Sequence, residues 1–553
     1  MKNKLILCAV LLAAAANTVM AQTNTAYYVD AARTTAGDGS AANPWTNWSS
    51  ISWTSVSNAL SNGPVTIYFS TLCTVADISG FTPKANGLSA SQMIQFIGDA
   101  YYNTNTTGTA VWYPETNGNR VFFTGAFSGT NYYGGSIELY CNNYFLCFKG
   151  IHITNSANAC ISCNPVSGTI TTTNLHDIYI TNCCLDSPKT QHGFYGGYLE
   201  TNCYNFVISG CQISNTMNEP IYMGHYCYFE QTITNVIIES NLIVNCGRGT
   251  NAYHQGQINL KPGVCGAIVR YNTKIYTLTS MHGGSAGIEC FGDNNQIYGN
   301  TFINELVAHD GSWGDGIMIA ADGDQADPPK SNGVVNIGPG EGNPAWTNGQ
   351  GSPITSCFIY NNVIVNCQND GIVAYATTTN VPGGASIAGV QIWNNVIWGN
   401  TNCGIYGSID SPQTMTIAQF NNNIIGNDGG IDVNLPRNIT LASADYNLYW
   451  RPSGTNWYYN RSYGVASFTA WQQLGFDAHG TNAVPSFIDS TNSNPFLLDF
   501  HLQPGSPGLA MGVPSGFFTV DMFQEPRPVA NWDLGPIQTQ PLAPPTNLRY
   551  ISQ

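Results

Sequence analysis

A short β pattern recurs along this chain about every thirty residues, and this repeat constrains the fold more than any other feature. Each copy has alternating apolar residues, a turn that contains Asn or Gly, and a second apolar pair. The copies begin at Ile178, Phe206, Val236, Ala267, Gln296, Phe358, Val390 and Ile417, with one interval of double length after Gln296. Self-similarity at roughly 20–50 residues is typical of solenoids and propellers. Short alternating runs broken by Asn and Gly favour strands over helices.

One coil of a parallel β-helix per repeat fits this pattern best. Propeller blades need more strands and longer periods, with sequence signatures that this chain lacks. Asn tolerates the left-handed backbone of a tight turn, and its amide can stack from one coil to the next. The sequence therefore predicts an all-β solenoid.

The composition agrees with stacked turns and strands rather than with charged helical surfaces. Only 9% of the residues are charged, against roughly 25% in typical soluble domains. The chain contains 58 Gly and 43% hydrophobic residues, enough for a buried core and too many for disorder over most of its length. The formal charge of −15 argues against unaided binding to nucleic acid or to an anionic membrane.

Residues 1–21 have the three regions of a secretory signal peptide. Lys2 and Lys4 precede an apolar run that ends at Ala16, and a small residue, Ala21, closes the segment. The run is too short to span a bilayer, and no later stretch is long and apolar enough to do so. We therefore expect a secreted or cell-surface protein that is a monomer.

Export permits disulfides, and only Cys8 of the 17 cysteines lies in the signal segment. Cys160 and Cys163 have CxxC spacing, but no second CxxC or CxxH partner supports a metal site. Many cysteines stand where other repeats carry Val, Ile or Asn. We expect most of them to be buried packing residues, with a few bridges.

Segments at both ends of the repeat carry a resemblance to a known superfamily. YYVD…GDGSAANPW (27–45) and AL..GPVTIYF (59–69) lie at the beginning, and DYNLYW (445–450), SFTAWQQLGFDAHG (467–480) and DFHLQPGSP (499–507) at the end. From about Tyr27 to Ile537 the chain resembles the secreted right-handed parallel β-helix proteins of the pectate-lyase-like superfamily. That resemblance implies a carbohydrate-active protein, such as a polysaccharide lyase or a glycoside hydrolase.

The predicted organisation follows from the repeat and from this resemblance. It consists of a signal peptide (1–21), an N-terminal cap with the first coils (22–145), a right-handed β-helix core (146–445) with an insertion at about 322–356, C-terminal coils and cap (446–540), and a Pro-rich tail (541–553). Solenoids need polar caps at both ends, so the two flanking regions have a structural role whatever the function.

A second strand in each coil predicts one outward face. Aligned by their first Ile, these strands begin at Ile221, Ile258, Ile288, Ile317, Ile372, Ile405 and Ile431. Because side chains alternate along a strand, the second and fourth residues point outward when the Ile points inward. The expected ladders are Tyr222, Asn259, Glu289, Met318, Val373, Tyr406 and Asp432, beside Gly224, Lys261, Phe291, Ala320, Tyr375, Ser408 and Asn434.

Coils stack about 4.8 Å apart, so Lys261 and Glu289 are expected to be near neighbours. Aromatic rings with a few charges along an elongated sheet suit a sugar chain. We predict substrate contacts at Tyr222, Asn259, Phe291, Trp313, Tyr375 and Tyr406. The alternative is a solvated sheet face with a surface ion pair, which contributes little.

The turns that lead into these strands contain a row of histidines. His254, His282 and His309 lie 28 and 27 residues apart, which matches the coil length and predicts one edge of the same face. His192 is placed in the same turn upstream. Histidine exchanges protons near neutral pH, and stacked histidines with carboxylates can also hold a transition metal.

Asp310, Trp313 and Asp315 follow His309 in HDGSWGDGI (309–317). For Asp315, in GDGI (314–317), and for Asp370, in NDGI (369–372), the alternative is that the turn recurs for backbone reasons alone. The catalytic candidates are therefore His254, His282, His309, Glu289, Lys261 and Asp315.

Two bond-cleaving chemistries fit these residues. HQGQINLKPG (254–263) resembles the site of chondroitinase- and alginate-lyase-like members, and the resemblance implies Lys261 as the base. Gln255 and Gln257 stand in place of that template's calcium-binding acids, and its arginine one coil later has no match. A glycoside hydrolase needs two carboxyls, which Glu289 with Asp315 or Asp310 can supply.

Calcium is a possible cofactor, with Asp310, Asp322 and Asp324 as oxygen ligands, although a plain acidic loop also explains DGDQAD (322–327). The predicted partner is an extracellular polysaccharide. The competing class is a non-catalytic glycan-binding or adhesin-like solenoid, and a groove on which the histidines and Glu289 converge would favour the enzyme.

Overall fold

The structure, a computed structural model of the chain, describes residues 24–30, 33–35, 37–69, 73–75, 81–98, 122–125, 135–140, 142–156, 159–164, 174–186, 188, 192–196, 203–224, 233–248, 258–261, 263–277, 286–305, 314–321, 354–376, 386–409, 414–435, 438–451, 457–459, 463–465 and 467–539. The expected signal peptide, the 322–353 part of the insertion and the Pro-rich tail lie outside these residues, as do His254, His282, His309, Asp310, Trp313, Asp322 and Asp324.

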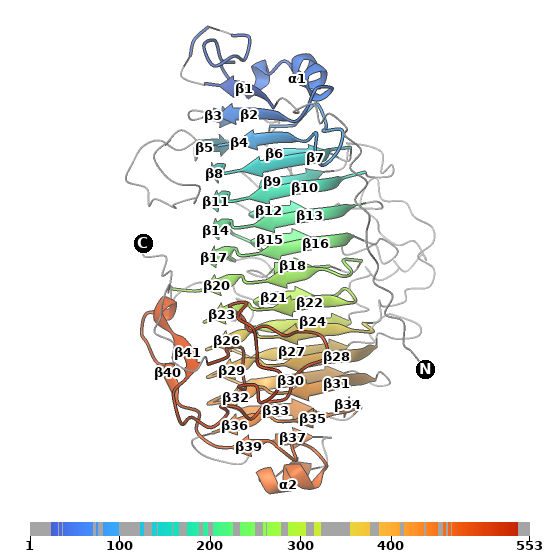
Figure 1. Cartoon of the computed structure of the whole chain (residues 1–553), viewed down its shortest axis with the longest axis vertical. Helices are drawn as coiled ribbons and strands as arrows, with labels where there is room; N and C mark the ends of the chain where they lie inside the picture. Colours follow the sequence, from blue (N-terminus) through green and yellow to red (C-terminus); the bar gives the residue numbers. More distant parts are fainter. Residues whose placement is uncertain are drawn as a thin grey trace, which may run out of the picture.

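Three long sheets of stacked strands form the body of the molecule (Figure 1). Each coil contributes one short strand to each sheet, and neighbouring strands within the stack run parallel. Parallel strands joined by crossovers take the right-handed sense. The chain is a right-handed parallel β-helix, as the repeat predicted.

The first sheet contains β1 (Thr25–Val29), β2 (Val65–Phe69), β4 (Ile94–Ile97), β7 (Tyr144–Lys149), β10 (His176–Thr181), β13 (Tyr204–Ser209), β16 (Thr234–Glu239), β19 (Ile268–Arg270), β22 (Asn295–Tyr298), β25 (Cys357–Tyr360), β28 (Ile387–Trp393), β31 (Met415–Asn421) and β34 (Ile439–Leu441), with β35 (Ala444–Asp445) paired to β31. The second contains β3 (Cys73–Val75), β5 (Phe122–Gly125), β8 (His152–Thr154), β11 (Cys184–Asp186), β14 (Gln212–Ser214), β17 (Leu242–Val244), β20 (Thr273–Ile275), β23 (Thr301–Ile303), β26 (Val363–Val365), β29 (Val396–Trp398), β32 (Ile424–Gly426), β36 (Leu448–Trp450) and β39 (Thr481–Asn482).

The third sheet, which carries the predicted outward face, contains β6 (Gly135–Tyr140), β9 (Ala159–Asn164), β12 (Phe194–Gly196), β15 (Ile221–Met223), β18 (Ile258–Leu260), β21 (Ile288–Cys290), β24 (Ile317–Ala321), β27 (Ile372–Ala376), β30 (Cys403–Ile409), β33 (Ile431–Leu435), β37 (Trp457–Tyr459) and β38 (Tyr463–Val465). Helix α1 (Trp53–Leu60) lies at one end of the stack and α2 (Phe468–Gln473) at the other, as Figure 1 shows. Among the described residues, no helix has the length and hydropathy that crossing a membrane would require.

A ladder of buried asparagines holds the turn between the first and second sheets. Its members are Asn241, Asn272, Asn300, Asn362, Asn395, Asn423 and Asn447, and each donates its side-chain amide to the side-chain oxygen of the next. Asp477 ends the ladder by accepting from Asn447. In the Asn-Asn doublets the first residue has positive φ, as in Asn361 (55°), and the second stacks. The predicted amide stacking is confirmed.

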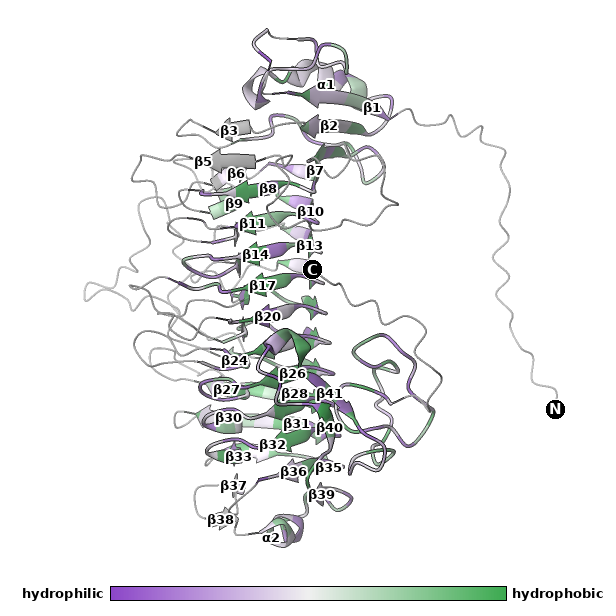
Figure 2. Ribbon diagram, turned by 90° about the vertical axis from the view of Figure 1, so that its left-hand side faces the viewer, coloured by the Kyte–Doolittle hydropathy of each residue, from purple (hydrophilic) through white to green (hydrophobic). Residues whose placement is uncertain are grey.

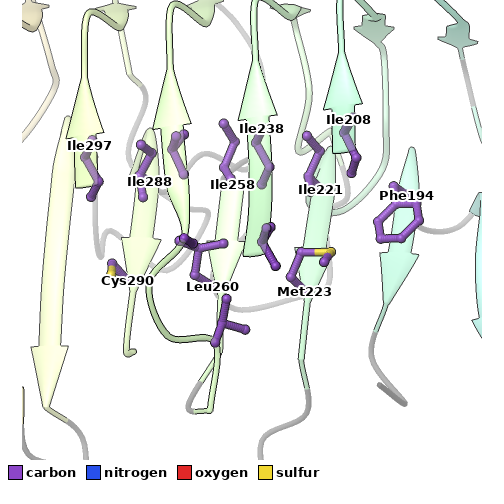
Figure 3. Packing of buried hydrophobic residues seen from close by; sticks show 14 of the residues in the cluster. Phe194, Ile208, Ile221, Met223, Ile238, Ile258, Leu260, Ile288, Cys290 and Ile297 are labelled. Atoms are coloured by element: carbon purple, nitrogen blue, oxygen red, sulfur yellow. The ribbon is translucent and has the colours of Figure 1, made fainter. Parts of the chain in front are cut away.

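The interior is filled by inward side chains of all three sheets. Figure 3 shows Ile221, Ile258 and Ile288 of the third sheet beside Ile208, Ile238 and Ile297 of the first. The described cysteines are free, and most of them are buried. Cys183, Cys211, Cys246 and Cys367 pack within this core, as their places in the repeat predicted.

Residues 486–539, here called the C-terminal strap, fold back along the outside of the coils. The strap includes β40 (Phe487–Asp489), β41 (Asp499–Leu502) and the 3-10 turn Pro495–Leu497. Its Phe487, Phe500 and Leu502 pack on outward side chains of the second sheet such as Val396. In Figure 2 the strap lies on the opposite side of the stack from β24, β27 and β30. It therefore covers a face other than the outward face of the third sheet.

Candidate active site

The strand register places most of the predicted outward ladder on one face. Tyr222, Asn259, Glu289, Met318, Val373 and Tyr406 are consecutive register partners on β15, β18, β21, β24, β27 and β30. In the second ladder Ala320 pairs with Tyr375, and Tyr375 with Ser408. The residues between them, such as Ile258 and Ile288, belong to the interior core. The alternation assumed from the sequence therefore holds from β15 to β30.

The prediction for the last member of the ladder is wrong. Tyr406 pairs with Asn434, not with Asp432, because Ile405 pairs with Val433 rather than with Ile431. Ile431 and Val433 have the same parity in the strand, so an apolar pattern of period two cannot detect a shift of two residues. Asp432 is therefore two residues out of register with the ladder.

A buried polar cluster lies where β18 and β21 meet. The amide of Asn259 donates to Oε2 of Glu289 (2.8 Å), and Nζ of Lys261 lies 3.9 Å from the same oxygen. Asn259, Lys261 and Glu289 are 0%, 1% and 2% exposed. The neighbours expected from the coil spacing are thus an ion pair, but a buried one. The alternative of a solvated surface pair is wrong.

Aromatic rings lie on both sides of this lysine. Nζ of Lys261 lies 4.7 Å from the ring centre of Phe291 and 5.5 Å from that of Tyr222. Such contacts stabilise an ammonium, and more strongly when it is desolvated. Because the pair is on the outward face, the interior core does not require it. It is a costly arrangement for a fold to keep for stability alone.

Asp315 has two roles within one carboxyl group. Its Oδ1 accepts from the backbone N–H of Asp370 (3.0 Å) and from the side-chain amide of Asn369 (2.7 Å), which is the turn role expected as the alternative. Its Oδ2 is buried and has no hydrogen-bond partner within the described segments. Burial, then the carboxylate of Asp370 and that of Glu289, raise the pKa of Asp315 to about 8. Asp315 is therefore a neutral carboxylic acid at pH 7.

Asp370 holds the same turn position one coil later. Its Oδ1 accepts from the backbone N–H of Cys403 (2.7 Å), and burial raises its pKa to about 6. The two aspartates share the turn function and differ in charge at neutral pH. This difference makes Asp370 a natural comparison for Asp315.

A second buried pair lies upstream on the same face. Nδ1 of His192 lies 3.1 Å from Oε2 of Glu219, and the His192 ring stacks on Tyr195 with centres 4.7 Å apart. Each member of the pair stands two residues before the inward residue that begins its strand, as Asp315 stands before Ile317. The sequence placed His192 in this turn but missed Glu219, although the shared offset could have found it.

Downstream of the ion pair the face becomes apolar. Phe291, Met318, Ala320 and Val373 are buried together with Ala286, and Tyr375 and Tyr406 pack against them. The predicted substrate contacts at Tyr222, Asn259, Phe291, Tyr375 and Tyr406 therefore share one face with Lys261 and Glu289.

The predicted histidine row, Trp313 and the calcium ligands lie outside the described residues, so the roles of His254, His282 and His309 stay predictions. Within the part of the chain that the structure describes, no group of three or more His, Cys, Asp or Glu side chains is placed to hold a metal ion. The catalytic geometry that can be described consists of Lys261, Glu289, Asn259 and Asp315.

Comparison with known proteins finds solved structures of low similarity and no related sequence. No protein-family model matches the chain, and no curated protein matches its sequence. A pectate lyase structure has 11% identity and a TM-score of 0.36, with 94% of this chain and 97% of that chain covered. A PL6-family polysaccharide lyase from Pseudopedobacter saltans has 13% identity and a TM-score of 0.40, with 79% and 90% covered.

A third similar structure is a GH136 lacto-N-biosidase from Eubacterium ramulus, with 11% identity, a TM-score of 0.32, and 71% of this chain and 68% of that chain covered. At these identities the likeness concerns the fold alone. The reaction has to be argued from the residues of this chain.

Proposed function

We propose that this protein cleaves a polysaccharide bound along the outward face of the third sheet, by hydrolysis with Asp315 as the acid. One observation carries the proposal. A desolvated Lys261–Glu289 pair lies on a face that does not build the core, and the carboxylate of Glu289 is close enough to the buried Asp315 to contribute to its raised pKa. Two carboxyls whose surroundings push their protonation states apart are the usual basis for assigning an acid and a base.

The roles follow from the surroundings of each group. Oδ2 of Asp315 carries the proton and gives it to the glycosidic oxygen as the bond to the anomeric carbon breaks. Glu289, beside the Lys261 ammonium and the Asn259 amide, is the carboxylate partner. It either attacks the anomeric carbon or takes a proton from a water, depending on the separation of the carboxyls. Either route consumes one water and leaves a new reducing end.

Elimination with Lys261 as the base is the second candidate. Nζ of Lys261 lies 3.9 Å from Glu289 and beside the rings of Phe291 and Tyr222, so it would have to leave these contacts to take a proton from a sugar. The geometry therefore favours hydrolysis. Residues 1–21 predict export, so the proposed substrate is an extracellular polysaccharide.

The test is a screen of the purified protein against a panel of polysaccharides, with and without Ca²⁺. New reducing ends without an ultraviolet-absorbing unsaturated product would support hydrolysis. Both signals rising together would refute it in favour of elimination. Retention by an insoluble glycan with no product from any substrate would favour a non-catalytic binding solenoid.

Two isosteric variants then assign the acid. Asp315→Asn keeps Oδ1 as the acceptor in the turn and removes the transferable proton, so kcat should fall about 10²–10⁴-fold. Asp370→Asn makes the same change in the next coil and also removes a charge that helps to keep Asp315 protonated. It should therefore lower the pH above which activity is lost, but leave kcat below about pH 6 within about threefold. Equal losses in the two variants would mean that Asp315 acts through the turn and not as an acid.

A further inference from the structure

The charges on the outward face of the third sheet restrict what kind of polysaccharide it can hold, if the face is the substrate face as proposed above. From β6 to β30 its described acids are Glu138, Glu219, Glu289, Asp315 and Asp370, and its described basic side chains are His192 and Lys261. Acidic groups therefore outnumber basic ones. A polyuronate would bring one further carboxylate for every sugar residue.

Both of these basic side chains already have a carboxylate partner. Lys261 lies 3.9 Å from Glu289, and His192 lies 3.1 Å from Glu219. Recruiting either side chain to a uronate would leave a buried glutamate without its partner. Leaving one buried charge uncompensated is strongly destabilising.

The acids also repel one another across adjacent coils. Asp315 is buried deeply enough that the charges of Asp370 and Glu289 help to keep it protonated. A uronate carboxylate bound here would meet the same field, and the whole chain adds a formal charge of −15.

The polar atoms that remain available suit hydroxyl groups. Oδ1 of Asn259 is buried and has no hydrogen-bond partner among the described residues, so it can accept from a sugar hydroxyl. The protonated Oδ2 of Asp315 can donate. Tyr375 and Tyr406, which are only partly buried against this apolar cluster, then offer apolar surface to the C–H side of a sugar ring.

The His192–Glu219 pair extends this surface upstream. It lies two to three coils from Glu289, roughly 10–14 Å along the stack, too far to join the same proton transfer. The His192 ring lies beside Tyr195 and Tyr222 (centres 4.7 and 5.5 Å apart). This arrangement offers aromatic and hydrogen-bonding contacts to a sugar residue upstream of the cleavage point.

We infer that the substrate is an uncharged polysaccharide, without carboxylate or sulfate groups, and that its hydroxyls are recognised by Asn259 beside the Lys261–Glu289 pair.

The test measures binding separately from cleavage. The Asp315→Asn variant is suitable because Asp315 is already neutral at pH 7, so the charge of the face is kept while turnover is suppressed. Its migration in affinity gels is measured with uncharged xylan, mannan, galactan and β-glucan, and with polygalacturonate and alginate. Low and high salt are compared, with and without Ca²⁺.

The expected result is retardation by at least one uncharged glycan, with an affinity that changes less than about twofold with salt. Retardation by polygalacturonate or alginate that weakens with salt or requires Ca²⁺ would overturn the inference. Failure to bind any of the uncharged glycans would overturn it as well. Asn259→Ala in the same background should weaken binding to the uncharged glycan about tenfold. Circular dichroism and the melting temperature control for folding.

The two proposals fail in different ways. An uncharged glycan that is bound and never cleaved by the wild type leaves this inference standing and refutes the proposed hydrolase. A polyuronate that is bound and hydrolysed, with Asp315→Asn inactive, refutes this inference and leaves the proposed hydrolase standing.

Discussion

Asp315 should make the native protein less stable as the pH rises, and its replacement by Asn should remove that effect. The pKa of Asp315 is raised from 3.8 to about 8 in the folded chain. Between these values the folded state holds a proton that the unfolded state has lost. The free energy of unfolding therefore decreases as the pH rises through this range. Asn keeps the Oδ1 that accepts from the backbone of Asp370, so the turn itself should survive.

The size of the effect follows from the two pKa values. A carboxyl that stays protonated in the folded state loses about 1.4 kcal/mol of unfolding free energy for each pH unit above its unfolded pKa. From pH 5 to pH 7 the contribution of Asp315 is therefore a loss of about 2–3 kcal/mol. Below about pH 3.8 both states are protonated, and the pH dependence of the wild type and of the variant should converge.

Urea unfolding at pH 5 and at pH 7, for the wild type and for Asp315→Asn, measures this difference. The wild type should lose about 2–3 kcal/mol more than the variant between the two pH values. Asp370→Asn is the matched control. The pKa of Asp370 in the folded chain is about 6, so the contribution of Asp370 to the pH dependence of the unfolding free energy should level off above pH 6. Identical pH dependence in the wild type and in Asp315→Asn would refute the argument that Asp315 is desolvated and neutral.

Two further predictions concern the interior. Asn362 accepts from the backbone N–H of Asn300 (3.0 Å) and donates to the carbonyl of Ile297 (2.9 Å). Asn362→Ala should therefore lower the free energy of unfolding in urea by about 2–4 kcal/mol. A loss below about 1 kcal/mol would contradict the view that the asparagine ladder stabilises the fold. Lys274 and Glu305 form a fully buried ion pair, so Lys274→Met should lower the free energy of unfolding by about 3–5 kcal/mol at pH 8. The loss should be smaller at pH 6, where Glu305 is mostly protonated, because burial raises its pKa to about 7 even beside Lys274. The double variant Lys274→Met/Glu305→Gln should recover most of the loss, and an equal cost for the single and double variants would show that the pair's charges do not matter.

Much of the candidate site could be predicted from the repeat. Once one coil corresponds to one repeat, alternation along the strand decides which side chains point outward, and the coil length decides which of them are neighbours. Lys261 and Glu289 were paired in this way, and the structure places them 3.9 Å apart. The same reasoning slipped by two residues at β33, where Ile431 and Val433 present the same pattern.

Other features depended on what packs around each residue. The Lys261–Glu289 pair could equally have been a solvated surface pair, and the fold buries it. Asp315 could have been turn punctuation alone, yet its Oδ2 is buried without a partner in the described part of the chain. Glu219 shares its offset from the strand with His192 and Asp315, but only the fold shows that its carboxylate lies 3.1 Å from His192. Residues 486–539 were expected within the C-terminal coils and cap, and the sequence did not indicate that they return over the second sheet.

The sequence by itself determined the periodic part of this protein, because each coil repeats the same local demands: apolar residues that alternate along short strands, and Asn where the backbone turns left-handed and the amides stack. The tertiary structure alone decided burial and charge state. Whether a lysine meets solvent or two aromatic rings, and whether an aspartate keeps its proton, depends on groups from several coils that are distant in the chain and adjacent in space.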